Sequence, residues 1–297
     1  MASTEALAMK DAFAAWAGSL AGKSMDDMRA SFHGLSDVGS IPDGVTFTDV
    51  DAGGVPAIWA VPDDASATRG VVYLHGGGFM LGAPEFYKAL TGHLAKELGC
   101  RVLNVDYRLA PEHQFPAALD DSVAAYRWML TQGVEAAGSA IVGDSAGGGL
   151  TLSSLMQLRD DGGPLPAAAI AISPLADLEA TGDSMTTNAA NDVLIQQAST
   201  LGMGMMYAGE DVTNPLASPL LGDYAGLPPI AFVVGSEETL LDDSTRCAAA
   251  AEAAGVDTTL DVVAEMQHDF VLGVGNVPES DAALQRMVSF LDAKLAG

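Results

Sequence analysis

Basic side chains are scarce in this sequence of 297 residues. It holds 13 Lys and Arg against 39 Asp and Glu, which gives a formal net charge of −26 at pH 7 with neutral histidine. Such a surface repels the phosphates of nucleic acids and anionic membranes, so we expect neither as a partner. The acidic surface also predicts salt tolerance. A salt titration of activity and thermal unfolding tests this, and collapse at molar salt would contradict it.

Cysteine and long apolar runs are also scarce. Cys100 and Cys247 are the two cysteines, too few for a disulfide framework, so a reducing compartment and two small buried side chains are expected. Charged residues interrupt the apolar pattern of residues 1–20, unlike in a secretory signal. No run reaches the roughly 18 apolar residues of a membrane span. We expect a soluble, cytoplasmic protein without membrane insertion.

Hydrophobic residues are plentiful, at 49% of the chain, and can form a large core. From residue 70 on, apolar strands and amphipathic helices alternate. Strands are expected over 70–74, 101–105, 140–142, 167–172, 230–234 and 258–263, and helices over 84–98, 116–131, 146–159, 240–254 and 281–295. Because the strands are continuous apolar runs, both sheet faces should be covered. The pattern predicts an α/β fold with a mostly parallel central sheet flanked by helices.

Two other regions interrupt this alternation. Apolar residues at helical spacing predict two helices within residues 3–35, and a turn signal between 45–50 and 56–61 predicts a hairpin. A polar and then Met-rich stretch predicts an inserted helical cap. The expected organisation is N-terminal helices that contribute to the cap (1–44), an α/β domain in two parts (45–174 and 220–297) and the cap insertion (175–219).

The chain is organised around Ser145, which lies in Gly143-Asp144-Ser145-Ala146-Gly147 between the expected strand over 140–142 and the expected helix over 146–159. This G-x-S-x-G pattern is typical of a nucleophile elbow, a sharp strand-to-helix turn that exposes the serine hydroxyl. In a chain rich in glycine and serine, an ordinary tight turn would give the same pattern. A nucleophilic serine therefore needs partners elsewhere in the sequence.

A glycine-rich loop offers the first partner. His75-Gly76-Gly77-Gly78-Phe79 follows the strand over 70–74, and consecutive glycines leave backbone N–H groups free to stabilise an oxyanion. A phosphate-binding loop is the alternative. It is disfavoured because neither G-x-x-x-x-G-K-[ST] nor G-x-G-x-x-G is present and no basic residue is near.

A histidine after the strand over 258–263 offers the second partner. His268 lies where parallel sheets place their chemistry, at the carboxyl end of a strand. The order Ser, acid, His also selects it. The other histidines fit this role less well and are expected to be structural: His33, His75, His93 and His113.

The third partner, a carboxylate that orients the histidine, is expected after the strand over 230–234. Glu237, Glu238, Asp242 and Asp243 compete there. The acid should lie on the loop before the helix begins, and this favours the two glutamates. The composition does not distinguish Glu237 from Glu238. Asp242 and Asp243 have an alternative role in the first turn of a helix, where the helix dipole favours acidic residues.

With these residues in place, the chain resembles the hormone-sensitive lipase family of α/β-hydrolases, the bacterial family IV carboxylesterases. The resemblance runs from about residue 70 to the C-terminus. Three motifs carry it: the 75–79 loop, the elbow around Ser145, and Asp106-Tyr107-Arg108-Leu109-Ala110-Pro111-Glu112. The elbow has the G-D-S-A-G form and is similar to that of the subgroup named for it. It implies an α/β-hydrolase fold with a helical cap.

The resemblance also implies roles for individual residues. Ser145 matches the nucleophile and His268 the base, while Gly77, Gly78 and Ala146 match the oxyanion donors. The family's D-x-L-x-D aligns with residues 238–242, where Glu replaces the commoner Asp, and this favours Glu238 as the acid. Asp144 matches a position next to the nucleophile that supports the site or faces the substrate.

The expected function is a serine carboxylesterase that hydrolyses short- to medium-chain acyl esters, with a small-molecule ester as partner and without a metal or other cofactor. An amidase, formamidase or acetyl-hydrolase would use the same residues. A non-catalytic small-molecule receptor, known in this family, is disfavoured because His268 is present. The family also makes a homodimer possible.

Overall fold

The central sheet has eight strands. The computed structural model describes residues 1–296. The strands are β1 (Val45–Asp51), β2 (Pro56–Pro62), β3 (Gly70–Leu74), β4 (Arg101–Val105), β5 (Ser139–Asp144), β6 (Ala168–Ile172), β7 (Ile230–Gly235) and β8 (Thr258–Val263). Their order is β1-β2-β4-β3-β5-β6-β7-β8. The β1–β2 hairpin is antiparallel and joins β4 antiparallel, while β3 to β8 are parallel. The mostly parallel sheet predicted from the sequence is confirmed.

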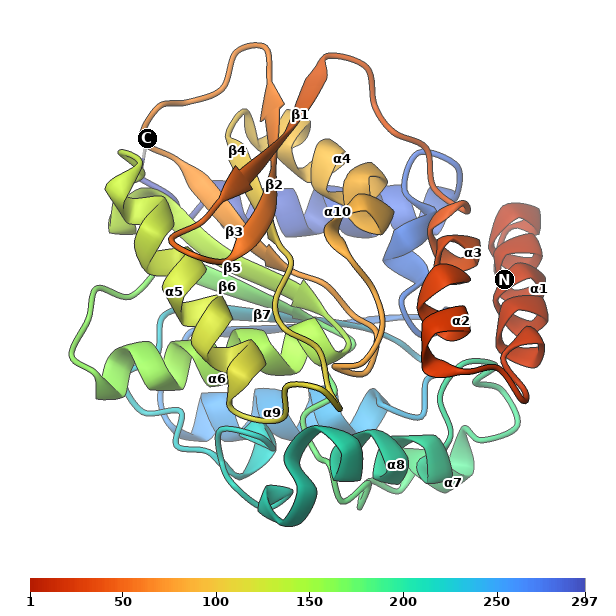
Figure 1. The fold of residues 1–297 in the computed structure, drawn as a ribbon. Helices are drawn as coiled ribbons and strands as arrows, with labels where there is room; N and C mark the ends of the chain where they lie inside the picture. Colours follow the sequence, from red (N-terminus) through yellow and green to blue (C-terminus); the bar gives the residue numbers. More distant parts are fainter. Residues whose placement is uncertain (297) are drawn as a thin grey trace.

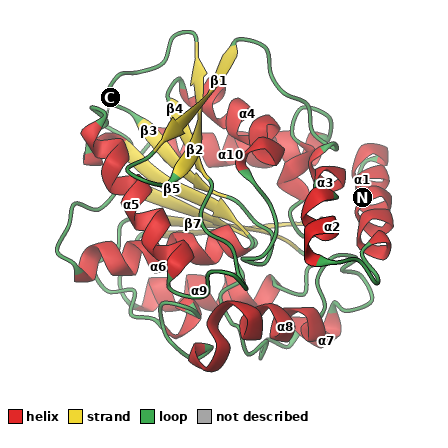
Figure 2. Ribbon diagram, viewed as in Figure 1, coloured by secondary structure: helices red, strands yellow, loops and turns green. Residues whose placement is uncertain are grey.

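Helices lie on both faces of this sheet (Figures 1 and 2). They are α1 (Thr4–Ser19), α2 (Met25–Ala30), α3 (His33–Ser36), α4 (Lys88–Leu98), α5 (Ala117–Thr131), α6 (Ala146–Asp160), α7 (Ser184–Thr187), α8 (Gln197–Ala208), α9 (Leu241–Ala253) and α10 (Pro278–Asp292). Helices α5, α6 and α9 cover one face, and α4 and α10 cover the other. The last helix begins earlier than expected because Pro278 suits the first helical position.

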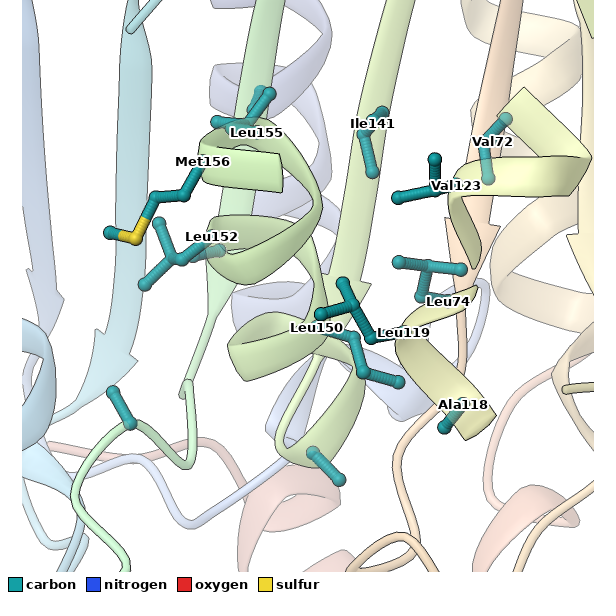
Figure 3. Packing of buried hydrophobic residues seen from close by; sticks show 14 of the residues in the cluster. Val72, Leu74, Ala118, Leu119, Val123, Ile141, Leu150, Leu152, Leu155 and Met156 are labelled. Atoms are coloured by element: carbon teal, nitrogen blue, oxygen red, sulfur yellow. The ribbon is translucent and has the colours of Figure 1, made fainter. Parts of the chain in front are cut away.

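Alternate residues of the parallel strands enter two cores. On β5, Ile141 faces the α5–α6 side, whereas Ala140 and Val142 face the α4–α10 side. Figure 3 shows the first side, where Ile141 lies near Val72, its partner on β3, and near Val123 of α5, while Leu150 of α6 lies near Leu119 of α5. All six residues of β5 are buried, so the strand that leads to Ser145 is held on both faces.

The edge strand β8 departs from the expected burial. Leu260 and Val262 are 39% and 42% exposed, although the strand over 258–263 was expected, like the inner strands, to be covered on both faces. Thr258, Thr259 and Asp261 interrupt its apolar character. β8 pairs only with β7 and lies at the edge of the sheet.

The N-terminal helices and the insertion between β6 and β7 lie toward the carboxyl ends of the parallel strands (Figure 1). Residues 3–35 form two helices, as expected, and the start of a third, single-turn helix α3. Ser3 caps α1 by accepting the N–H of Ala6, and this register turns Ala6, Met9 and Phe13 inward. Leu7 therefore lies outside the buried stripe and is 54% exposed.

Both cysteines are buried and free, which confirms the expected burial. Burial is the main reason why the pKa of Cys100 rises to about 12 and that of Cys247 rises even further. Between residues 1 and 296, no helix is both long and apolar enough to cross a membrane.

Candidate active site

Ser145 occupies a sharp turn between β5 and α6. Its backbone has φ 51° and ψ −119°, a strained conformation for a residue with a side chain. The neighbouring chain segments pass too closely for any side chain at two positions. An added Cβ on Gly143 would lie 2.3 Å from the Gly147 carbonyl oxygen, and one on Gly147 would lie 1.9 Å from that of Leu74. The glycines of the G-x-S-x-G pattern are therefore required by close packing.

A hydrogen-bonded chain links three of the residues singled out in the sequence. The Nε2 atom of His268 lies 2.9 Å from Ser145 Oγ, and its Nδ1 atom lies 2.9 Å from Glu238 Oε2. With the imidazole proton on Nδ1, His268 donates to Glu238 and accepts from the serine hydroxyl. The serine is 4% exposed, the histidine 2% and the glutamate 0%, so the chain is shielded from bulk water.

The carboxylate of Glu238 is held at both of its oxygens. Its Oε1 atom accepts the Ser173 hydroxyl at 2.7 Å and the Gly235 N–H, which leaves Oε2 for His268. Burial raises the pKa of Glu238, and the hydrogen bonds from His268 and Ser173 oppose this shift. These donors fix the carboxylate in the position that orients the imidazole.

The competing carboxylates point elsewhere. Glu237 accepts from Lys10 Nζ on α1 and from the Gln267 amide, both at 2.8 Å. Asp242 and Asp243 lie in the first turn of α9, as expected for a helix N-terminus. Asp242 accepts the Ser184 N–H, and the buried Asp243 accepts two backbone N–H groups of the segment that follows β6. These two side chains thus fasten the insertion to α9.

The glycine-rich loop and the serine share one cavity. Gly77 and Gly78 line it together with Ser145 and His268. Their φ values of 119° and 63° favour glycine, and the left-handed backbone turns the loop sharply at this point. Ala146 is the first residue of α6, where a backbone N–H has no acceptor within the helix. The arrangement thus brings the predicted oxyanion residues to the serine.

Three of the other four histidines, His33, His75 and His93, contact backbone carbonyl oxygens. His75 Nδ1 lies 2.8 Å from the Gly76 oxygen, and its ring stacks on Tyr107 with centroids 4.3 Å apart. Burial lowers the pKa of His75 to about 4. His93 lies 3.0 Å from the Ser40 oxygen, and His33 Nδ1 lies 2.9 Å from that of Ala30. Their contacts agree with the structural roles expected for them.

The cavity beside Ser145 is largely apolar and has a volume of about 370 Å³. Trp16 of α1 and Phe32, which precedes α3, line it, as do Met203 and Met206 of α8. Met203 packs directly on the glycine-rich loop, since a Cβ added to Gly78 would lie 2.2 Å from its Sδ atom. The N-terminal segment and the insertion therefore both contribute walls to a single apolar pocket.

Asp144 is enclosed beneath the serine. Its carboxylate accepts the hydroxyl groups of Tyr73 at 2.6 Å and Tyr87 at 3.1 Å. Burial is the main reason why its pKa rises to about 6, although the two tyrosines oppose this shift. Of the two possibilities for this position, the contacts favour support of the elbow over contact with a substrate.

Sequence reasoning missed Asp269 and Ser173. Both have positive φ values, 56° and 43°, which few residues other than glycine adopt. Ser173 holds Glu238, and Asp269 lines the cavity with its Oδ2 atom 3.4 Å from His268 Nε2. The one available signal was their position directly after β6 and directly after His268. It did not indicate where their side chains point.

The electrostatic environment of His268 is strongly negative. Burial by itself lowers the pKa of His268, but Asp269, Glu238 and Asp192 outweigh burial and raise it to about 10. Burial raises the pKa of Asp269 as well, and the neighbouring carboxylates add to this shift whereas His268 opposes it. The neighbouring carboxylates therefore stabilise the protonated imidazole against the desolvation that burial imposes on it.

The described part of the chain contains no group of three or more His, Cys, Asp and Glu side chains that could hold a metal ion. The expectation that the protein uses neither a metal nor an organic cofactor remains a prediction.

Comparisons with known proteins agree with this architecture. A family model described as alpha/beta hydrolase fold matches residues 71–272. An acetyl-hydrolase of Streptomyces hygroscopicus is 43% identical over 82% of this chain and 81% of its own length. An esterase of Acinetobacter venetianus is 36% identical over 76% of this chain and 75% of its own length.

A solved structure extends the likeness over the whole fold. The crystal structure of an esterase from the bacterial hormone-sensitive lipase family covers 100% of both chains at 38% identity, with a TM-score of 0.96. The match therefore includes the N-terminal helices and the insertion as well as the sheet. On these grounds the chain belongs to the α/β-hydrolase fold family and, within it, to the hormone-sensitive lipase group.

Proposed function

We propose that this protein hydrolyses carboxylic esters of short- to medium-chain acids through an acyl-enzyme on Ser145. The coarser statement, that it is a serine ester hydrolase, follows from its family and from relatives named esterase and carboxylesterase. The observation that carries the finer proposal is the continuous chain from Ser145 through His268 to Glu238 beside an apolar cavity.

In the proposed mechanism His268 acts first as base and then as acid. Nε2 takes the proton of Ser145 as Oγ attacks the ester carbonyl carbon, and Glu238 stabilises the imidazolium. The N–H groups of Gly77, Gly78 and Ala146 stabilise the oxyanion. His268 then protonates the leaving alcohol. In the second half it activates water, which releases the acid and restores Ser145.

The size of the cavity supports short and medium acyl chains. A volume of about 370 Å³ is at the lower end of small-molecule pockets. Met203 lies over Gly78 and forms part of the wall next to the serine. Its flexible side chain is therefore a candidate for the group that limits how long an acyl chain can be.

Met203→Ala is expected to favour longer esters because it removes this part of the wall. The kcat/KM for a nitrophenyl octanoate relative to a nitrophenyl butyrate should rise about tenfold, within the range of one to a few methylene contacts. Met205→Ala is the matched control, since Met205 lies on the same helix but is 59% exposed. An unchanged ratio in Met203→Ala, or an equal rise in the control, would contradict this assignment.

An amidase, formamidase or acetyl-hydrolase is the alternative on the same machinery, and one relative is named an acetyl-hydrolase. A substrate panel separates these activities. Nitrophenyl esters of acetate, butyrate and octanoate are compared with the nitroanilides of the same acids and with the nitroanilide of formic acid. The proposal predicts higher kcat/KM for esters of several acyl lengths, whereas preference for amides, or for acetyl groups alone, would favour the alternative.

Four further expectations from the sequence remain proposals. The first is a division into cap segments (1–44 and 175–219) and an α/β domain (45–174 and 220–297), and the second is a homodimer. The third is a cytoplasmic location, which rests on cysteine usage. The fourth is salt tolerance, which rests on the net charge of −26.

A further inference from the structure

Asp269 is a buried carboxylate beside the atom that receives the serine proton. Its Oδ2 atom lies 3.4 Å from His268 Nε2, the same nitrogen that lies 2.9 Å from Ser145 Oγ. The side chain is 8% exposed, and its Oδ1 atom has no hydrogen-bond partner. The proposed mechanism gives this group no role, although burial of an unsatisfied carboxylate is costly.

Each of the other acidic groups around His268 accepts hydrogen bonds from groups other than His268. Glu238 accepts from Ser173 and Gly235, and Asp192 accepts the N–H groups of Leu194, Ile195 and Thr239. Asp144 accepts from Tyr73 and Tyr87, and the charge of Asp269 contributes to raising the pKa of both tyrosines. Among all of these groups, His268 is the one that can carry a positive charge. Asp269 therefore differs from its neighbours in relying on His268 for compensation.

We propose that Asp269 is a positioning residue that holds the protonated imidazole of His268. It thereby sets the lowest pH at which His268 can accept the proton of Ser145. This inference rests on the proposed function. Glu238 contacts Nδ1, so it orients the ring in both protonation states. Asp269 lies next to Nε2 and interacts favourably only when that nitrogen carries a proton. The ion pair therefore withdraws His268 from its role as base.

The expected effect follows from the sign of this interaction. An opposite charge within about 4 to 6 Å raises the pKa of a histidine by about 1 to 3. Without the carboxylate, His268 loses its proton at lower pH and becomes an active base there. The acidic limb of the kcat/KM profile should therefore move to lower pH, whereas the alkaline plateau should change little.

Asp269→Asn tests this proposal with the shape of the side chain retained. Asn tolerates the φ value of 56° at this position at least as well as Asp. Asp269→Gly is the second variant, because glycine also suits this backbone and removes the carboxylate entirely. Glu237→Gln is the matched control: it removes a carboxylate from the neighbouring loop that contacts Lys10 and Gln267 and not His268.

The measurement is kcat/KM for a nitrophenyl butyrate across the pH range in which each variant remains folded. Both Asp269 variants are expected to shift the acidic limb down by about 1 to 2 pH units, with the control superimposed on the unaltered protein. Limbs that coincide in all proteins would overturn the role of Asp269. An unaltered protein without esterase activity would instead overturn the proposed function.

Discussion

Replacement of Ser145 by alanine is expected to lower kcat for a short-chain nitrophenyl ester by about 10⁴- to 10⁶-fold. The Ser145 hydroxyl, which is hydrogen-bonded to His268, is the group that forms an ester with the acyl group of the substrate. Its removal leaves the cavity and the glycine loop in place, so substrate binding should largely persist. Initial rates with purified protein, checked for folding by thermal melting, measure the effect.

Ser154→Ala provides a control within α6, the helix that follows Ser145. Ser154 is buried in α6 and its hydroxyl has no hydrogen-bond partner, so alanine should be tolerated. Activity is expected to stay close to that of the unaltered protein. Retention of most activity in Ser145→Ala would contradict the acyl-enzyme mechanism. Equal loss in both variants would point to damage to α6 and not to the chemistry.

The second large effect is expected at Glu238. Glu238→Gln keeps the size of the side chain but removes the charge that stabilises the imidazolium, and its amide can impose the wrong tautomer on His268. We expect kcat to fall by about 10²- to 10⁴-fold. Steady-state kinetics near the pH optimum test this, with KM expected to change much less than kcat.

Glu237→Gln is the matched comparison, because it changes the adjacent glutamate in the same way. Glu237 contacts Lys10 and Gln267, so its loss should weaken the link between α1 and the catalytic loop and leave kcat within a few-fold. If Glu237→Gln were the more damaging variant, the assignment of Glu238 as the acid would be wrong.

Much of the fold could be predicted from the spacing of apolar residues along the sequence. The strands that lie inside the sheet are short and mostly apolar, and the helices between them bury one stripe, so the alternation of strands and helices and the mostly parallel pairing could be predicted. β8 is the exception. It was expected to be covered on both faces like the inner strands, but Thr258, Thr259 and Asp261 interrupt its apolar character, in agreement with its partly exposed place at the edge of the sheet.

Some residues of the candidate site could likewise be predicted from the sequence, and others could not. Ser145 and the glycine loop could be found because their backbone geometry restricts the residues on either side, as the close approach of Gly147 to Leu74 illustrates. Glu237 and Glu238 are adjacent and chemically alike. Which one reaches His268 depends on the direction each side chain takes from the turn after β7, and on Ser173 and Lys10 from distant parts of the chain.

Asp269 could not be recognised for a related reason. A carboxylate beside a histidine is ordinary in sequence and acquires meaning only when its side chain turns toward Nε2. The left-handed backbone at residue 269 brings this about, and positive φ values at residues other than glycine are not apparent from the sequence.

The central claim is that Ser145 is a nucleophile activated by His268, and covalent labelling tests it most directly. The protein is treated with an alkyl nitrophenyl phosphonate, and its intact mass and modified peptide are determined by mass spectrometry. We predict one phosphonyl group per chain, on Ser145, and no label in His268→Ala at the same exposure. Absence of a label, or a label on another residue, would contradict the account, and absence would favour a non-catalytic receptor.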